Sequence, residues 1–380
     1  MQRIGDLSFS LNIRLLKIIG VYPSDNYKTV HKIYGYVLYI VAIVPVAVCG
    51  LLHFTCTADL TKFKNNDFVM IGIIFYPIKF FPCLIHRNKI KHCIHYYDHF
   101  DYNFLTHDHQ KIIEECISTC RRNSKIFVIG CAAAVTGFIG QTLMNLEQLS
   151  LDIWLPKFVL EKPVYFYCAQ FLIVTSTIYS GFFCGSIDPL MGELCYHATT
   201  QIRIVKEILQ HFDQQRSVLK NLEAKSRGIF MEIKKCVRHH QTIQNFVQEF
   251  QDCFSMVIFT QFVASSFVMA FVCFQLSRMK VGLNFLTAAN DLMVVSFQVF
   301  FYCYHGTLLI EESKSLSDAI YMSRWYEYDI QSKKALILLM ERSKKPMVVT
   351  AGRLLQVSLE TFTMILKRTY SFLAILENYS

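Results

Sequence analysis

Long apolar stretches separated by basic, polar segments dominate the pattern of this chain. Six of them are nearly free of charge and run for about 18–25 residues, the length that a helix needs to cross the ~30 Å hydrocarbon core of a bilayer. These stretches are Tyr34–Phe54, Phe68–Ile85, Ile126–Leu146, Val164–Ile187, Cys253–Ser277 and Leu283–Tyr304. A weaker seventh stretch, from Met347 to about Leu376, contains several charged residues. The pattern predicts an all-α, polytopic membrane protein with seven transmembrane helices.

The composition agrees with a membrane protein and excludes several other classes. Hydrophobic residues make up 53% of the 380 positions, charged residues make up only 18%, and the mean hydropathy is +0.31. Soluble domains carry about 25% charged residues. The apolar excess therefore argues against a single soluble domain, a disordered chain and a small disulfide scaffold. Short segments of alternating hydrophobicity are missing, which argues against a transmembrane β-barrel.

The distribution of Lys and Arg predicts how the chain is oriented in the membrane. Segments 1–33, 86–125 and 311–346 together carry 19 basic residues. The segments that alternate with them, 55–67, 148–163 and 278–282, carry only 6. Because positively charged loops stay in the cytoplasm, we expect a cytoplasmic N-terminus and, with seven spans, an extracellular C-terminus. The net charge of +9 then reflects orientation rather than a nucleic-acid partner.

The segments that we place in the cytoplasm are long and amphipathic. Segment 188–252 has apolar residues at helical spacing and no proline after Pro189, so we expect the fourth span to continue into the cytoplasm as a long helix. Segments 88–122 and 328–345 are amphipathic as well. We expect these segments to pack into one cytoplasmic helical layer, and independent flexible loops are the alternative.

Cysteine and histidine give no sign of a disulfide framework, a metal site or an enzyme. Most of the 14 cysteines fall in spans or cytoplasmic segments, and we interpret them as small apolar fillers, including Cys116 and Cys120. His95 and His99 have helical spacing, but no second pair of ligands matches them, so no metal is expected. The HExxH, P-loop and GxSxG motifs are absent from the sequence. We therefore predict neither a catalytic residue nor a cofactor.

The seventh stretch carries its polar residues on one helical face. Their spacing alternates between 3 and 4 residues, and the face comprises Arg353, Gln356, Glu360, Thr363, Lys367, Tyr370, Leu373 and Glu377. Charged side chains in a membrane helix face water or a polar partner. One such stripe per subunit lines a channel only when several subunits surround an axis. The pattern leaves two interpretations open, a pore wall or a polar seam inside one helical bundle.

Several short motifs follow one another from the end of the sixth stretch onward. Cys-Tyr-His-Gly at Cys303–Gly306 is followed by Asp-Ala-Ile-Tyr and Trp-Tyr within Glu311–Asp329. Lys-Lys-Pro and Thr-Ala-Gly then occur within Lys333–Gly352, and Thr-Tyr-Ser occurs within Ser358–Leu376. As a set, these motifs closely resemble the C-terminal signature of insect odorant receptors. The rest of the chain is similar to that family in length, expected spans and orientation.

The resemblance implies a ligand-gated, non-selective cation channel in which four subunits surround a pore lined by the seventh helix. It divides the chain into residues 1–310 with six helices and an odorant pocket, 311–345 as a cytoplasmic anchor, and 346–380 as the pore-lining helix. The residues that match the anchor between subunits are Trp325, Tyr326, Lys345 and Pro346. Leu373 and Glu377 match the outer gate, although other members have an apolar side chain in place of Glu377.

The family contains odour-tuned subunits and a shared co-receptor. The co-receptor has a long cytoplasmic insertion for which this chain is too short, so the resemblance implies an odour-tuned subunit that partners with odorant co-receptor subunits in the plasma membrane of olfactory sensory neurons. A gustatory-receptor-like channel is the alternative, but its Gln-Phe pair is missing after Thr369-Tyr370. A metabotropic seven-helix receptor would place the N-terminus outside, and a secondary transporter would show internal repeats, which are absent.

The resemblance also implies an apolar pocket for a small volatile ligand in the outer half of the second, third, fourth and sixth helices. Aromatic rings and Met provide adaptable contacts there, and Gln or Tyr can donate to a ligand oxygen. The residues predicted to line the pocket are Gly72, Phe75, Tyr76, Gly137, Gln141, Met144, Tyr167, Gln170, Val174, Met293 and Phe297. Of the charged residues nearby, Lys79 is expected to snorkel to the inner headgroups and Asp291 to cap or pair near the outer interface.

Overall fold

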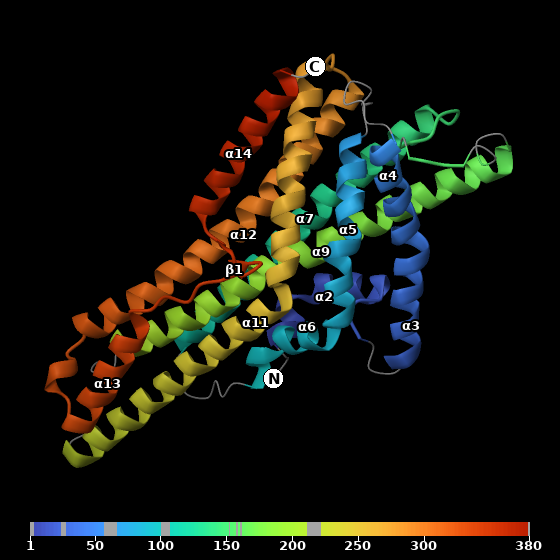
Figure 1. Cartoon of the computed structure of the whole chain (residues 1–380). Coiled ribbons are helices and arrows are strands. Elements are labelled where there is room, and N and C mark those ends of the chain that lie inside the picture. Colours follow the sequence, from blue (N-terminus) through green and yellow to red (C-terminus); the bar gives the residue numbers. More distant parts are fainter. Residues whose placement is uncertain are drawn as a thin grey trace.

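Helices form almost all of the protein (Figure 1). The computed structural model describes residues 4–23, 28–56, 67–99, 107–151, 153–156, 159, 162–210 and 222–378. The elements in chain order are α1 (Ile4–Ser8), α2 (Ser10–Ile19), α3 (Lys28–Leu38), η1 (Tyr39–Ile43), α4 (Val44–Cys56), α5 (Asp67–Ile85), α6 (Arg87–Ile94), η3 (Tyr96–His99), α7 (His107–Met144), α9 (Pro163–Gln210), α11 (Leu222–Arg278), α12 (Leu283–Met322), η5 (Trp325–Glu327), α13 (Ile330–Ser343), β1 (Thr350–Ala351), β2 (Leu355–Gln356) and α14 (Leu359–Asn378).

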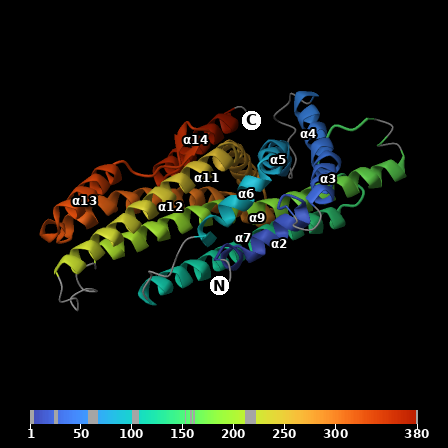
Figure 2. The ribbon, with the colours of Figure 1, turned by 90° about the horizontal axis from the view of Figure 1, so that it is seen from below.

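Four helices are much longer than a bilayer requires. Helices α7, α9, α11 and α12 contain 38, 48, 57 and 40 residues. A helix of about 20 residues already spans the hydrocarbon core, so each of these continues well beyond it. The far ends of α11 and α12 pack against α13 and, together with the end of α9, form an elongated arm, which Figures 1 and 2 show from two sides. Segments 188–252 and 328–345, two of the three segments expected to form one helical layer, therefore pack together where the chain is described.

In the described part of the chain, five helices are long and apolar enough to cross a membrane. They fall within Thr29–Cys56, His109–Met144, Pro163–Gln210, Ser226–Arg278 and Asn284–Met322. A sixth is added if Val69–Ile85 and Arg87–Ile94, which meet at a bend of 71°, count as one span. Among the described residues, α14 does not meet the same criterion, so a seventh span stays a prediction.

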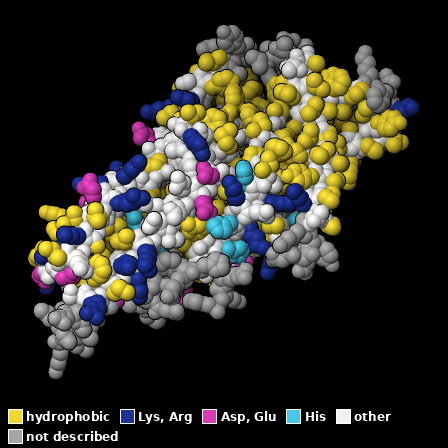
Figure 3. All heavy atoms as spheres, turned by 60° about the horizontal axis from the view of Figure 1, so that its bottom comes forward, with side chains coloured by type: hydrophobic (Ala, Val, Ile, Leu, Met, Phe, Trp, Pro, Cys, Tyr) yellow, Lys and Arg dark blue, Asp and Glu magenta, His cyan; other side chains and the backbone are white. Residues whose placement is uncertain are grey.

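The surface divides into an apolar part and a charged part (Figure 3). We call the first part the apolar belt, and among its exposed side chains on α4, α5, α7 and α9 are Leu51, Phe81, Ile129 and Phe171. Large exposed hydrophobic surface is unusual in a soluble protein and is expected where lipid covers it. Lys, Arg, Asp and Glu gather instead over the arm in the same view. This division agrees with a membrane-embedded body and a water-exposed arm.

Helix α9 is the central element of the bundle. It packs against α2, α7, α11 and α12, and its side chains are buried almost without interruption from Phe183 to Val205. In Figure 2 it lies between α7 on one side and α11 with α12 on the other. Side chains on this part of α9 therefore contact most of the other long helices.

The expectation of one helix from Met347 to about Leu376 is wrong at its start. A short antiparallel hairpin, β1 paired with β2, precedes α14, which begins only at Leu359. The turn of the hairpin contains Gly352 and Arg353, both with positive φ, so the chain cannot be helical there. The Gly352 amide donates to the Ser255 carbonyl oxygen of α11 at 2.9 Å, which holds the turn against that helix.

This hairpin changes the placement of two residues on the expected polar stripe. Gln356 lies in β2 and Arg353 in the turn, where its guanidinium is 3.0 Å from Asp252, so neither belongs to α14. The 3 and 4 spacing continues on a real helix only from Glu360 onward. The spacing from Arg353 to Glu360 contains only two intervals, of 3 and 4 residues. So short a run of polar positions also fits a hairpin, so it did not distinguish a hairpin from a helix.

Candidate functional site

A cavity lies inside the belt, enclosed by α5, α7, α9, α11 and α12. About 150 Å³ of it is open to the centres of water-sized molecules, whereas one water needs only about 10–15 Å³ by this measure. Its walls are mainly apolar, with Ile73, Val135, Phe138 and Val268 among them. The cavity therefore has the size and character of a binding site for one small organic molecule.

Three of the residues predicted to bind the ligand line this cavity, and all three lie on α5. Gly72, Phe75 and Tyr76 occur one turn apart and face the enclosed space. Their spacing on a helix that packs against α11 explains why the sequence pattern was informative here.

The other predicted ligand residues lie outside the cavity lining. Met144, Tyr167 and Met293 are exposed, and Phe297 is partly exposed against Phe127 and Phe301. Gly137 and Gln141 contact Thr287 between α7 and α12. Gln170 hydrogen-bonds to Ser150, and Val174 packs behind the cavity wall against the cluster that includes Ile73 and Phe138.

The cavity uses neighbouring faces of the same helices. The lining residues on α9 include Thr177 and Gly181, and those on α12 include Val294, Val295 and Gln298. A shift by one residue turns a side chain by 100° around a helix, so an error of one position moves it to another face. Helix α11, with Gln261, Ala264, Ser265 and Val268 on the lining, was not predicted to contribute. Polar residues inside apolar stretches could have indicated the cavity lining, and these are Gln261, Asp291 and Gln298.

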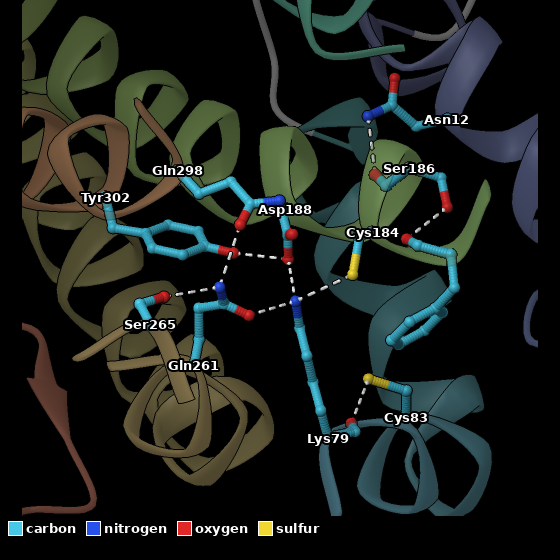
Figure 4. Close-up of polar contacts among 11 residues, drawn as sticks. Asn12, Lys79, Cys83, Cys184, Ser186, Asp188, Gln261, Ser265, Gln298 and Tyr302 are labelled. Atoms are coloured by element: carbon cyan, nitrogen blue, oxygen red, sulfur yellow. Dashed lines mark hydrogen bonds and ion pairs between the residues drawn. The ribbon is translucent and has the colours of Figure 1, made fainter. Parts of the chain in front are cut away.

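Lys79 does not snorkel to the headgroups, contrary to expectation. Its side chain is buried, and Nζ lies 2.5 Å from Oδ1 of Asp188 and 2.6 Å from Oε1 of Gln261 (Figure 4). The Cys184 sulfur is a further neighbour at 3.5 Å. A lysine ammonium inside the belt requires a nearby carboxylate, because an isolated buried charge costs many kcal/mol. Asp188, which meets this need, was not singled out from the sequence.

The buried charge pair belongs to a larger polar cluster at one end of the cavity. We call it the polar floor, and it consists of Lys79, Asp188, Gln261, Gln298 and Tyr302. The Tyr302 hydroxyl donates to Asp188 Oδ1 at 2.6 Å, and Gln261 Nε2 donates to Gln298 Oε1 at 3.0 Å. Figure 4 shows these side chains converging from α5, α9, α11 and α12. The polar floor therefore joins four helices that surround the cavity and presents Lys79, Gln261 and Gln298 to it.

Asp291 lines the cavity from α12 rather than capping a helix near the outer interface. It lies nine positions into α12, where every backbone amide already has a helical partner, so capping is excluded. Its half-buried carboxyl group instead adds an acidic position to the cavity wall. The cavity thus offers a cationic group at one point and an acidic group at another.

The polar stripe of α14 faces away from the rest of the chain between Glu360 and Tyr370. Glu360, Thr363, Lys367 and Tyr370 are all exposed. The opposite side of the helix packs inward, with Ile365 and Thr369 buried. Leu373 is partly buried against the cluster that includes Phe271 and Val272, and the side chain of Glu377 lies outside the described residues. Within one chain, these four side chains do not form a buried seam.

The predicted anchor residues flank α13, with Trp325 and Tyr326 before it and Lys345 and Pro346 after it. Trp325 packs partly against the main core, whereas Tyr326 is 60% exposed. Asp329 accepts hydrogen bonds from the Gln331 and Ser332 amides and so caps the start of α13. Lys345 and Pro346 follow α13 and lead the chain towards β1. The segment between α12 and the hairpin is therefore ordered and partly exposed.

The apolar belt, the long helices and the enclosed cavity define a multi-pass helical membrane protein with the architecture of a receptor. The family model described as 7tm Odorant receptor matches residues 59–370, and the chain belongs to that family. Its relatives are receptors rather than enzymes, in agreement with the missing catalytic motifs.

Individual relatives are distant in sequence, and the part of the chain that they match varies. Odorant receptor Or1 of Anopheles gambiae is 23% identical over 98% of this chain and 95% of its own length. Odorant receptor 85b of Drosophila melanogaster is 30% identical over 46% of this chain and 45% of its own. Among solved structures, the olfactory receptor OR5 from Machilis hrabei in complex with eugenol superimposes with a TM-score of 0.83, at 12% identity over 98% of each chain. The fold is thus shared despite extensive sequence divergence.

Proposed function

We propose that this chain is an odour-tuned subunit of a ligand-gated, non-selective cation channel in the plasma membrane of olfactory sensory neurons. In this proposal it assembles with odorant co-receptor subunits into a tetramer, with the N-terminus in the cytoplasm and the C-terminus outside. The family membership supports the receptor function, and the basic residues of the expected cytoplasmic segments support the orientation.

The cavity suits a small, mainly apolar molecule with one hydrogen-bonding group. Phe75, Tyr76 and Phe138 provide aromatic surface, and the side-chain amide nitrogen of Gln298 provides a donor at the polar floor. A few polar groups in an apolar wall fix the orientation of a ligand, while the wall supplies most of the contact area. The structure of OR5 from Machilis hrabei was determined with eugenol, which is a molecule of this kind.

Contacts between aromatic rings connect the cavity to α14, and this observation carries the proposal. Phe75 on the cavity wall stacks with Phe267 of α11 at a centroid distance of 6.2 Å. Phe267 meets Phe372 of α14 edge to face at 5.6 Å. A ligand that displaces Phe75 therefore acts on α14 through two direct contacts, without the need for a long pathway.

The exposed stripe of α14 supports the assignment of this helix to the pore. Four polar side chains that face outward in one chain need water or other subunits around them when they lie at membrane depth. A central axis surrounded by four copies of α14 meets this need, since each copy would present the stripe to a shared aqueous path. In the proposal, the polar face comprises Glu360, Thr363, Lys367 and Tyr370, and Leu373 with Glu377 lies towards the outer mouth.

The exposed apolar side chains at the end of the arm support its role as the anchor between subunits. Tyr321, Met322, Tyr326, Ile330 and Leu338 are all at least 60% exposed. The arm is otherwise rich in charge, and exposed aromatic and aliphatic groups in such a setting are typical of protein contacts. The proposal assigns Trp325, Tyr326, Lys345 and Pro346 to this contact region.

Electrical recording with and without the co-receptor tests the proposal. We expect odour-evoked cation current only when both subunits are expressed. Phe75→Ala and Tyr76→Ala should change the rank order of odours, because they alter the cavity wall, whereas Met144→Ala on the exposed surface should not. Equal surface expression is verified with an extracellular tag. Unchanged odour ranking in both cavity variants would contradict the placement of the ligand in this cavity.

A second experiment separates coupling from ligand binding. Phe267→Leu should reduce the maximal current at saturating odour, because it removes both ring contacts, while exposed Phe171→Leu should have no effect. Cysteine in place of Tyr370 should react with a charged thiol reagent and reduce the current, whereas cysteine in place of buried Thr369 should not. Equal reactivity at both positions would argue against a pore-facing stripe.

A further inference from the structure

A cluster of metal-ligating side chains lies apart from the cavity, between α7 and α9. Cys116 and Cys120 project from α7, and His197 projects from α9. All three are almost completely buried, with exposed fractions of 1%, 0% and 3%. One ligand atom of each residue lies within 4.8 Å of the others. The sequence pattern suggested apolar fillers, but filling space does not require two thiols and an imidazole to converge.

A fourth group, Glu193, lies near this arrangement, although its carboxylate oxygens are not within 4.8 Å of all three ligand atoms. Glu193 lies one helical turn before His197 on α9, just as Cys116 lies one turn before Cys120 on α7. Residues four apart share a helical face, so two facing helices each contribute a pair. We call these four residues the thiol–imidazole cluster. Glu193 is fully buried, and its Oε2 atom has no hydrogen-bond partner among the described residues.

The hydrogen bonds around Glu193 do not compensate its charge. The Ser124 hydroxyl lies 2.8 Å from Glu193 Oε1 and 2.7 Å from Asn12 Oδ1, and its single proton cannot serve both acceptors at once. The Asn12 amide nitrogen is already used by the Ser186 carbonyl oxygen at 3.0 Å. A buried carboxylate with so little support is costly unless a cation or a proton balances it. The surroundings thus favour a positive charge at this point.

We propose that Cys116, Cys120, Glu193 and His197 bind one Zn²⁺ ion. Two sulfurs, an imidazole nitrogen and a carboxylate oxygen form a ligand set that suits tetrahedral zinc. With Zn–S bonds of about 2.3 Å, tetrahedral ligand atoms lie about 3.8 Å apart. Cys116, Cys120 and His197 must therefore close by up to roughly 1 Å through rotation, and the Glu193 carboxylate must move farther. Zinc replaces the two thiol protons, which pass to the solvent, and the imidazole binds in its neutral form.

The residues around the cluster are arranged as outer-shell partners of a metal site. The Ser8 hydroxyl lies 3.0 Å from Nε2 of His197, and the Phe9 ring packs against the imidazole at 5.1 Å between centroids. Such contacts fix the orientation of a metal-binding histidine. Zinc would therefore join α7 to α9 and would hold the short N-terminal helices α1 and α2 against them. This role is structural and is independent of the odorant cavity.

Metal analysis of the purified full-length protein tests the proposal. In lipid nanodiscs, the wild-type protein should contain about one zinc ion per chain, measured by elemental mass spectrometry. After zinc has been removed with a chelator, the protein should take up one equivalent of added Zn²⁺. Cys116→Ser and Cys120→Ser should reduce the zinc content at least tenfold. Cys195→Ser and Cys236→Ser, which change other buried cysteines, should leave it unchanged. Wild-type protein that neither contains nor takes up zinc would overturn the proposal, as would full zinc retention in both cluster variants.

Cobalt provides a readout that does not depend on variants that fold poorly. Co²⁺ added to the metal-free wild-type protein should give a thiolate-to-metal charge-transfer band, because two sulfurs enter the coordination sphere. Glu193→Gln should retain this band but change the visible d–d bands, since only the oxygen ligand differs. If the cysteine variants cannot be purified, the wild-type spectrum alone tests whether thiolates coordinate the metal. The absence of a charge-transfer band at one equivalent of Co²⁺ would refute thiolate coordination.

Discussion

Two ion-pair clusters join α9 to other helices, and they differ mainly in their surroundings. At the polar floor, Lys79 and Asp188 meet at 2.5 Å with exposed fractions of 3% and 0%. In the arm, Arg203 and Lys206 each meet Glu312 at 2.7 Å, and the three side chains are 36%, 25% and 16% exposed. The distances are nearly equal, but only the second cluster is exposed to bulk water.

This difference decides what each cluster contributes. Beneath the cavity, both charges are removed from bulk water, so the pair is tolerated because each partner compensates the other. In the arm, water can replace a lost partner, so the contribution to stability is small. Burial acts to raise the pKa of Glu312, but hydrogen bonds and charge from Lys206 and Arg203 outweigh it and leave that pKa below its ordinary value. The geometry of an ion pair alone therefore does not indicate its importance.

Removing one partner of the buried pair should have the largest effect. Asp188→Ala leaves the Lys79 ammonium uncompensated and should destabilise the protein by about 3–5 kcal/mol. The double variant Lys79→Met and Asp188→Leu removes both charges and should recover most of this loss. Thermal unfolding in detergent, followed by intrinsic fluorescence, measures both. A double variant that is no more stable than the single one would show that the charge pair is not the cause.

The hydrogen bond from Tyr302 to Asp188 should matter next. Tyr302→Phe removes one donor to a buried carboxylate and should cost about 1.5–3 kcal/mol, the range for hydrogen bonds to charged groups. Tyr304→Phe, on the same helix but 41% exposed, serves as the control. Equal unfolding midpoints for the two variants would contradict the assigned role of Tyr302 in the polar floor.

The arm also contains buried titratable groups, which make it sensitive to acid. Burial, followed by the charge of neighbouring His240, lowers the pKa of His239 to about 3. In the unfolded chain its pKa is about 6.5, so the unfolded state binds the proton first as the pH falls. His239 therefore favours folding fully only above about pH 6.5, and stability should fall by up to about 1.4 kcal/mol per pH unit below that value. His239→Phe should reduce this slope, whereas exposed His92→Gln should preserve it.

The smallest effect is expected in the half-exposed cluster. Glu312→Gln should change the free energy of unfolding by less than about 1 kcal/mol, because Arg203 and Lys206 remain hydrated. The same thermal unfolding experiment measures it, and added salt should shrink the difference further. A loss as large as that of Asp188→Ala would mean that exposure does not separate the two clusters.

The sequence predicted elements better than it predicted contacts. The apolar stretches located α5, α7, α9, α11 and α12, because hydrophobic length and helical period are local properties. The pairing of Lys79 with Asp188 joins positions 109 residues apart, and no local pattern contains it. The start of α14 was misplaced because the contact of Gly352 with Ser255 of α11, which holds the hairpin, is likewise long-range. Cavity residues were predicted on α5, α7, α9 and α12 but, outside α5, on neighbouring faces, and the contribution of α11 was missed.

The length of α11 gives it the mechanics of a lever. Its 57 residues correspond to about 86 Å at 1.5 Å per residue. The arm portion from Leu222 to Cys253 is then about 46 Å long, and a tilt of 3° beside the cavity displaces its tip by about 2.4 Å. A rearrangement too small to detect around a ligand thus becomes measurable at the far end of the helix. Distances between spin labels near Leu222 should therefore be measured with and without ligand to detect this displacement.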